Sequence, residues 1–162
     1  MTKIKVIVKK FFLLSICVGL SLSCDKKTVF NQNKDFENAK WQIKNECKFE
    51  FEIEDPSLSY SLFYNVRNNL SYPYYNLFVT RYLLDEKGNL IEEKLDELIL
   101  ENEKTGEPLG TGLGDIFDHK ILVANSLKFS KKGKYTIKVK QFMRQNPLPD
   151  VVSFGVAIEK NR

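Results

Sequence analysis

Histidine and cysteine are scarce in this chain of 162 residues, and their scarcity excludes several kinds of chemistry. His119 is the only histidine, so a zinc site built from two histidines is impossible, and the chain has no HExxH or CxxC motif. A G-x-S-x-G nucleophile elbow is also missing. One histidine beside Asp118 is typical of a structural or exposed position, so we expect no enzyme activity, no cofactor and no metal site.

The chain also lacks an apolar run of the roughly 20 residues that a helix needs to cross a bilayer. The run from Phe11 to Ser23 has 13 residues and follows four lysines without any acid, which is typical of a secretory leader. Cys24 follows the small Ser23, as in leaders that are cut before a lipidated cysteine. We therefore expect a signal peptide over residues 1–23 and lipid attachment at Cys24. A transmembrane anchor and an ordinary thiol at Cys24 are the alternatives.

An excess of positive charge is absent once this leader is removed. Four of the 25 basic residues precede Cys24 and none of the 21 acidic residues does, so the remaining chain carries 21 of each. The apparent net charge of +4 thus gives no argument for nucleic-acid binding. Cys47 is then the only thiol left, which excludes an internal disulfide. We interpret it as a small buried hydrophobic residue, with a reactive thiol as the alternative.

Long helical patterns are missing too, and period-two alternation dominates after residue 46. Short runs rich in Phe, Tyr, Val and Ile are separated by turn-forming stretches such as "DEKGN" and "SKKGK". This pattern predicts an all-β fold, a single antiparallel β-sandwich of Ig-like or jelly-roll-like type over residues 46–160. Residues 24–45 are polar and aperiodic, so we expect a lipidated cysteine followed by a flexible tether. Only "LIEEKLDELIL" is ambiguous, and we favour a strand over a helix there.

Two exposed surfaces are candidates for contacts with a partner. "SYPYYNLF" is rich in tyrosine, which stacks on sugars or protein partners, although a position in the core and its rim is the alternative. "KYTIKVKQFMR" places its lysines on one face, which suits an acidic partner or anionic lipid headgroups, the alternative being a plain solvated face. The candidate partner residues are Tyr72, Tyr74, Tyr75, Arg144, Lys134, Lys138 and Lys140.

The glycine-rich stretch "GEPLGTGLGDIFDH" is not a phosphate loop. Its spacing fits neither the Rossmann fingerprint nor the Walker loop, and no Lys-Ser/Thr pair follows. We expect these glycines to serve positive φ, a bulge or a close approach between strands. Calcium binding by Asp115 and Asp118 is the weaker alternative, because a compact set of five or six oxygen ligands is not apparent.

Several of these stretches, in this order, resemble the gliding-motility lipoprotein GldH family of gliding Bacteroidetes. The similarity runs from about Trp41 to Lys160 and includes the lipoprotein leader. Its carriers are "NVRN" (65–68), "YPYYNLF" (72–78), "LGTGLGDI" (109–116), "KKGKYTIKVKQFMR" (131–144) and "NPLPDVVSFGVAIEK" (146–160). One departure is Pro108, where the family usually has tryptophan.

The resemblance implies a membrane-anchored, non-catalytic accessory component of the gliding machinery, linked to type IX protein secretion and held by lipid at Cys24. Its implied partners are the membrane and other gliding or secretion proteins of the envelope, without nucleic acid or a small-molecule substrate. Lys26 and Lys27 follow Asp25 where surface-exported lipoproteins of this group tend to have an acidic run. We therefore expect a periplasm-facing domain. A lipid-anchored carbohydrate-binding module, or another envelope interaction module, is the alternative.

Overall fold

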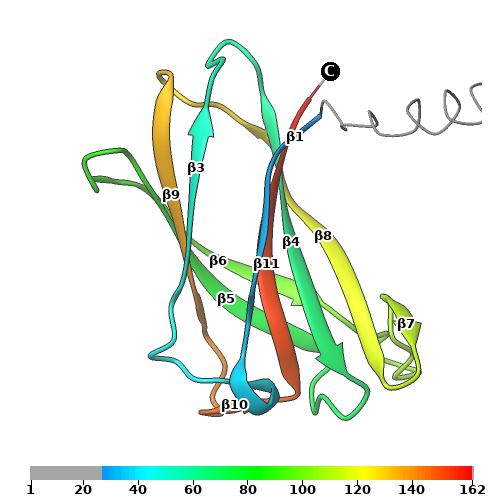
Figure 1. Cartoon of the computed structure of the whole chain (residues 1–162). Coiled ribbons are helices and arrows are strands. Elements are labelled where there is room, and N and C mark those ends of the chain that lie inside the picture. The colour runs from blue at the N-terminus through cyan, green and yellow to red at the C-terminus, as the bar shows by residue number, and fades with distance from the viewer. Residues whose placement is uncertain (1–26, 162) are drawn as a thin grey trace, which may run out of the picture.

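The alternating segments of the sequence form two antiparallel sheets that pack face to face (Figure 1). The structure, a computed structural model, describes residues 27–161, so the predicted signal peptide and Cys24 lie outside the described residues. One sheet has five strands in the order β1 (Thr28–Asp35), β11 (Val151–Lys160), β4 (Tyr60–Asn69), β8 (Ile116–Leu127) and β7 (Thr111–Leu113). The other has four, in the order β3 (Cys47–Ile53), β9 (Gly133–Gln141), β5 (Asn76–Leu84) and β6 (Leu90–Ile99). The predicted all-β sandwich is confirmed.

A third, minimal ladder closes one end of the sandwich. There β10 (Leu148–Pro149) pairs with β2 (Lys40–Trp41), just after the short 3₁₀ turn η2 (Glu37–Ala39). This ladder holds the fully buried Trp41, whose ring stacks on Phe36 and lies 5.0 Å from the ring of Phe154. The only tryptophan therefore links the N-terminal segment to the last strand.

The interior follows from period two, because alternate side chains of a strand point to opposite faces. In β3 the burial alternates without exception, with Cys47, Phe49, Phe51 and Ile53 inside. The expectation that Cys47 is a small buried hydrophobic residue is confirmed. Burial raises the pKa of its thiol from 9.0 to about 12, which makes it a poor nucleophile at neutral pH.

The predicted tether over residues 24–45 is wrong from Thr28 onward. Residues 28–35 form β1, which pairs with β11 along its length at the edge of the five-stranded sheet. Its one large apolar residue, Phe30, reaches inward to Phe49 and Phe51. An edge strand that is largely exposed needs few apolar residues, which explains why the polar sequence "TVFNQNKD" showed no strand pattern. The folded domain therefore begins at Thr28 and not at residue 46.

The ambiguous segment is strand β6, as we expected, but its two faces are the reverse of a usual amphipathic strand. The apolar Ile91, Leu95 and Ile99 are exposed, while Asp96 is buried against Arg81 of β5. Arg81 is 1% exposed, and its Nε lies 3.3 Å from Asp96 Oδ2. The hydroxyl of Tyr64, from the facing sheet, donates to the same oxygen at 2.8 Å. This buried polar contact joins the two sheets.

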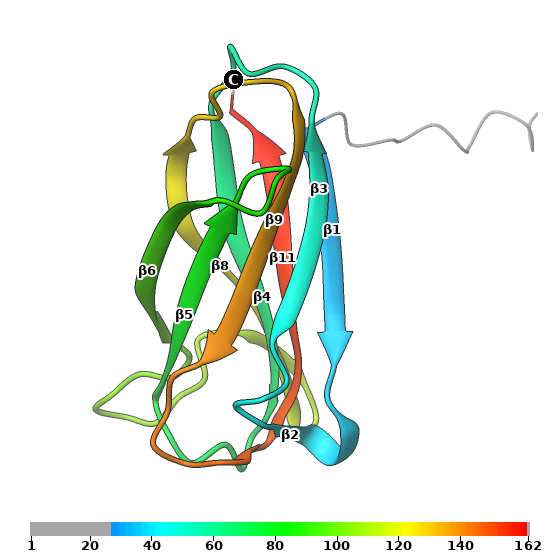
Figure 2. The same ribbon diagram turned by 90° about the vertical axis from the view of Figure 1, so that its left-hand side faces the viewer.

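The chain enters and leaves the domain at the same end. The amide of Lys160 donates to the carbonyl of Lys27, so the start of β1 and the end of β11 lie together. Figure 1 shows this end at the top, and the end of β9 and the β10 ladder at the bottom. Figure 2 shows the four-stranded sheet in front of the five-stranded one. No helix within residues 27–161 is long and apolar enough to span a membrane.

Candidate functional site

An apolar hollow opens on the outer face of the four-stranded sheet, where β9 ends. It has a volume of about 420 Å³, and we call it the distal hollow because it lies toward the end away from the chain's entry point. Its lining comes from β5, β6, the loop before β5 and the segment after β9: Tyr74, Phe78, Leu95, Phe142, Met143 and Arg144. Phe142 is 64% exposed and Leu95 is 50% exposed. Large apolar groups gathered in a hollow at the surface are typical of contact sites.

Backbone and side-chain hydrogen bonds hold the segment after β9 in place. The amide of Phe142 donates to the carbonyl of Phe78 at 2.8 Å, which extends the pairing of β9 with β5 by one bond. The amide of Met143 then donates to Oε1 of the buried Gln141 at 2.7 Å. The Tyr74 hydroxyl donates to Gln145 Oε1 at 3.0 Å, which ties the loop before β5 to the same segment. The hollow is therefore anchored on two sides.

A second shallow depression shares Leu95 and Phe142 with the distal hollow. It continues across the same face to Tyr82 and the exposed Ile43. The exposed apolar groups thus form a band across β5 and β6. This band exists because β6 turns Leu95 and its two isoleucines outward, while only Leu98 is buried beside the inward-facing Asp96.

The three candidate tyrosines are separated by the structure. Tyr72 is only 4% exposed, and its hydroxyl donates to the backbone carbonyl of Asn76. Tyr72 is therefore a core residue and cannot belong to a partner surface, which corrects that expectation. Tyr74 packs edge-on against Tyr72 and lines the distal hollow, while Tyr75 is exposed but not part of the lining. Of the candidate residues, the hollow brings Tyr74 together with Arg144.

The candidate lysines of β9 point outward, as expected, but they face acids of their own chain. Lys138 and Lys140 lie 3.3 Å and 3.2 Å from the two carboxylate oxygens of Glu46. Lys134 lies opposite Glu52 in the pairing of β3 with β9. Lys140 also lies over the ring of Tyr82, with Nζ 5.8 Å from its centroid. The basic stripe is thus largely balanced within the sheet, and its role as a partner surface stays a prediction.

His119 is buried beneath the glycine-rich stretch. An added Cβ on Gly110 would lie 2.8 Å from its ring, so the absence of a side chain there admits the imidazole. Burial lowers the pKa of His119, and the nearby Asp118 carboxylate acts in the opposite direction. Asp118 is itself bound to Arg67 at 2.7 Å. The loop glycines serve backbone geometry as predicted, since Gly114 has φ of +65° in the turn between β7 and β8.

Within residues 27–161 no group of three or more His, Cys, Asp or Glu side chains is placed to hold a metal ion.

The sequence did carry a signal for the distal hollow. Phe142 follows Lys138 and Lys140 at the next outward position, just past the end of β9, where a solvated strand would have another polar residue. An aromatic residue at an outward position marks a surface that is not simply solvated.

The comparison with known proteins identifies the family. The family model described as GldH lipoprotein matches residues 28–158, nearly all of the described domain. The chain belongs to the GldH lipoprotein family. The match begins with β1, in agreement with the domain boundary found in the structure.

Two curated relatives support this membership. The GldH homolog of Christiangramia forsetii, a gliding motility lipoprotein by name, is 31% identical over 93% of this chain and 94% of its own length. The gliding motility lipoprotein GldH of Flavobacterium johnsoniae is 31% identical over 86% of this chain and 84% of its own. Among solved structures, the VP2 subviral particle of infectious bursal disease virus aligns with a TM-score of 0.38 and 14% identity. That alignment covers 87% of this chain and 36% of the viral one.

Proposed function

We propose that the protein is a non-catalytic, lipid-anchored accessory component of the gliding-motility machinery, linked to type IX protein secretion, and that it binds an envelope protein through the distal hollow. Family membership supports the gliding role, since both curated relatives carry that function in their names. The observation that carries the contact surface is the reversed orientation of β6, which exposes Leu95 beside Phe142. Exposed aromatic and arginine side chains such as Phe142 and Arg144 are common anchors of protein interfaces.

The position of the hollow suits a protein held by lipid at Cys24. Three residues lie between Cys24 and Thr28, so the four residue-to-residue steps of this link span at most about 13 to 14 Å. The domain would therefore sit close to the membrane, with its chain-entry end toward the lipid. The distal hollow is lined in part by the segment that follows β9, and Figure 1 shows the end of β9 at the opposite end of the domain, so the hollow would face a partner in the periplasm. A short link also limits the orientations that the hollow can adopt, so the partner must stand at a defined distance from the membrane.

The deciding experiment replaces apolar residues of the hollow in a gliding host that lacks its own copy of the gene. Leu95→Glu and Phe142→Asp should abolish colony spreading and impair export of surface adhesins, because a carboxylate in the hollow would be desolvated by the partner. Leu113→Glu is the matched control: this leucine is 93% exposed on β7, far from the hollow in the sheet order. Immunoblots of the membrane fraction must show equal amounts of all three variants.

Normal spreading of the Leu95→Glu and Phe142→Asp strains would reject the hollow as the contact surface. Normal spreading and secretion after deletion of the gene would reject the gliding role itself. A photo-reactive amino acid at position 142 should crosslink to one envelope protein that the same group at position 113 does not capture.

The lipid anchor is tested separately. Cys24→Ala should remove palmitate label from the protein and release the domain from the membrane, since stable anchoring depends on the buried acyl chains. Palmitate label that persists on Cys24→Ala would show that the lipid is attached elsewhere. This outcome would leave the distal hollow as a contact surface untouched.

A further inference from the structure

The outer face of the five-stranded sheet carries ordered polar rows that the proposed gliding role does not use. In β11 the outward positions hold the small residues Ser153, Gly155 and Ala157, between the longer outward side chains of β1 and β4. One row across the sheet is Asn33, Gly155, Asn65 and Lys120 in direct register. Small residues in the middle strand leave room for the flanking side chains to meet above it.

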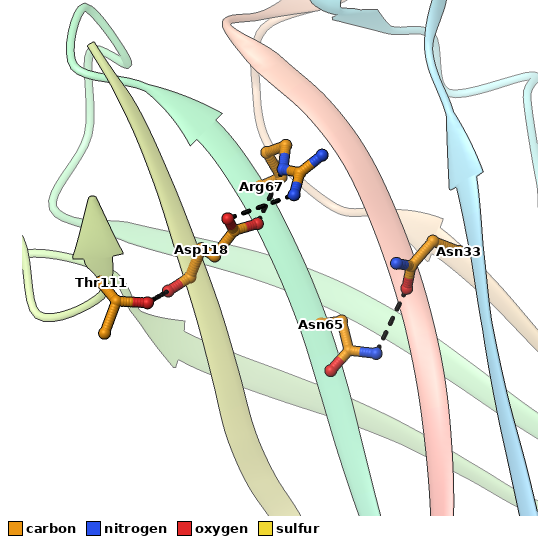
Figure 3. A network of polar contacts seen from close by, with 5 residues as sticks. All are labelled: Asn33, Asn65, Arg67, Thr111 and Asp118. Atoms are coloured by element: carbon orange, nitrogen blue, oxygen red, sulfur yellow. Dashed lines mark hydrogen bonds and ion pairs between the residues drawn. The ribbon is translucent and has the colours of Figure 1, made fainter. Parts of the chain in front are cut away.

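The carboxamides of this face form a connected cluster. Asn65 Nδ2 donates to Asn31 Oδ1 at 2.9 Å and to Asn33 Oδ1 at 3.2 Å. Figure 3 shows Asn33 and Asn65 facing one another across β11. An added Cβ on Gly155 would collide with the Asn33 side chain, so this contact depends on the glycine. The remaining amide hydrogens of Asn31 and Asn33 and the Asn65 oxygen have no hydrogen-bond partner among the described residues, and they are available to a ligand.

The charges beside the cluster neutralise each other. Arg67 binds Asp118 through two bonds, Nε to Oδ1 at 2.7 Å and Nη2 to Oδ2 at 3.2 Å (Figure 3). The Lys120 ammonium forms a single ion pair with Oε1 of Glu159. Both cations on this face are therefore already paired, so an anionic ligand would have to displace a carboxylate. The face suits a neutral ligand that both donates and accepts hydrogen bonds.

A cleft of about 550 Å³ joins this polar cluster to an apolar rim, a volume within the usual range of small-ligand sites. The three asparagines line one part of it, and Ile99, Leu109 and Ile121 line another. His119 also lines the cleft; it is 6% exposed, and its Nε2 is buried with no hydrogen-bond partner among the described residues. A buried nitrogen without a partner is unfavourable.

We propose that this cleft is a binding site for a neutral oligosaccharide. Sugar hydroxyls donate and accept at once, as carboxamides do, and the C–H faces of a pyranose ring suit the aliphatic rim. Most of the strand residues that line the site belong to the five-stranded sheet, while Ile99 of β6 comes from the sheet that carries the distal hollow. The site replaces the tyrosines of residues 72–75 as the location for sugar binding, because Tyr72 is buried and Tyr74 is engaged in the hollow.

The test measures glycan binding by the full-length lipidated protein in nanodiscs prepared without sugar-based detergents. The probes are maltohexaose, cellohexaose and chitotetraose as neutral sugars, and a sulfated oligosaccharide of similar length as the anionic comparison, titrated by calorimetry. Asn65→Ala should weaken binding roughly threefold to tenfold, because it removes the group that orders the other two carboxamides. Gln32→Ala is the matched control: it removes a carboxamide from β1 at the position between Asn31 and Asn33, outside the cleft.

Binding of at least one neutral sugar that is weakened by Asn65→Ala and unchanged by Gln32→Ala supports the site. The proposal is overturned if no neutral probe binds, if only the sulfated probe binds, or if both variants change the affinity equally. Thermal unfolding of each variant checks that the fold persists, which we expect because these side chains face solvent. Spreading assays of Leu95→Glu report on the other sheet, so failure of the sugar site leaves the proposed gliding contact standing.

Discussion

The buried ion pair between Arg81 of β5 and Asp96 of β6, which also accepts the Tyr64 hydroxyl of the facing sheet, makes a quantitative prediction about the stability of the sandwich. We expect Arg81→Met to destabilise the domain by about 3–5 kcal/mol, since removing one partner of a buried ion pair leaves an uncompensated charge. After this change, Asp96 would keep only the Tyr64 hydroxyl at 2.8 Å and the Lys94 ammonium at 3.6 Å. The Lys94 side chain is half exposed, so its attraction is screened by water and replaces little of the lost interaction.

The other contacts of Arg81 determine how much the substitution of its partner, Asp96→Asn, should destabilise the domain. Arg81 Nη1 lies 3.0 Å from Glu92 Oε2, although the two atoms are not aligned as a hydrogen bond, and we count this contact as an ion pair only. Asp96→Asn therefore leaves the guanidinium with one carboxylate and should cost less than Arg81→Met, about 1.5–3 kcal/mol. The double variant should cost less than the sum of the two, with a coupling of about 0.5–3 kcal/mol, because the second change removes a charge that the first has left unpaired.

Urea unfolding followed by fluorescence measures these differences without an added probe. Trp41 is the only tryptophan and is fully buried against Phe36, so its emission reports the loss of packing. Tyr64→Phe, which removes one hydrogen bond to Asp96, should cost about 1 kcal/mol and calibrates the scale. Additive single-variant costs, within about 0.5 kcal/mol, would refute the reasoning, as would a loss below about 1 kcal/mol for Arg81→Met.

Three further predictions concern the core and the polar face. Cys47 should resist iodoacetamide at about pH 8 in the folded protein and react in urea, because burial raises the pKa of its thiol to about 12; equal rates in both states would contradict this. Burial lowers the pKa of His119, so the unfolded chain, with its histidine pKa near about 6.5, takes up a proton that the folded chain excludes. The stability contributed by the neutral imidazole is therefore full above about pH 6.5, and below that pH the free energy of unfolding falls by at most about 1.4 kcal/mol per pH unit. Urea titrations of His119→Gln at several pH values should lack this fall. Gly155→Ala should destabilise the domain by about 1–3 kcal/mol, because the added Cβ would lie 2.6 Å from the Gln32 carbonyl oxygen and closer still to Asn33. In thermal unfolding, the double variant with Asn33→Ala should recover part of that loss.

The strands with regular alternation could be predicted from the sequence, and β3 and β9 are the clearest cases. Apart from the buried Gln141, their inward residues are apolar, and apart from Thr136 their outward side chains are charged, so pattern and burial largely coincide. In β6 the two disagree, because Arg81 supplies a partner inside the sandwich that makes a buried aspartate acceptable. Which side chain of another strand faces Asp96 depends on the register of β5 with β6, and a single sequence does not contain that register.

The N-terminal boundary could not be predicted for a related reason. Strand β1 is stabilised mainly by its backbone pairing with β11, whose paired residues are at least 118 positions away in the chain, and by the contacts of Phe30. Backbone hydrogen bonds leave no mark in a side-chain pattern. Asn31 and Asn33 look like ordinary linker residues until β11 places them beside Asn65. The carboxamide cluster was invisible for this reason, and the distal hollow, which is also assembled from segments distant in sequence, was marked only by the outward Phe142.

The short link before β1 changes what the two outer faces can do. With a tether of some 20 residues the domain could turn freely, and either face could reach any neighbour within that radius. With three residues between Cys24 and Thr28, the proposed lipid at Cys24 would hold this end of the strands near the membrane, and the two sheets would expose their outer faces in different lateral directions. A protein bound at the distal hollow would therefore leave the carboxamide cleft open, and a glycan bound there would leave the hollow open. The two contacts can be made at the same time because the apolar core and the hydrogen bond from Tyr64 to the buried Asp96 hold one sheet against the other.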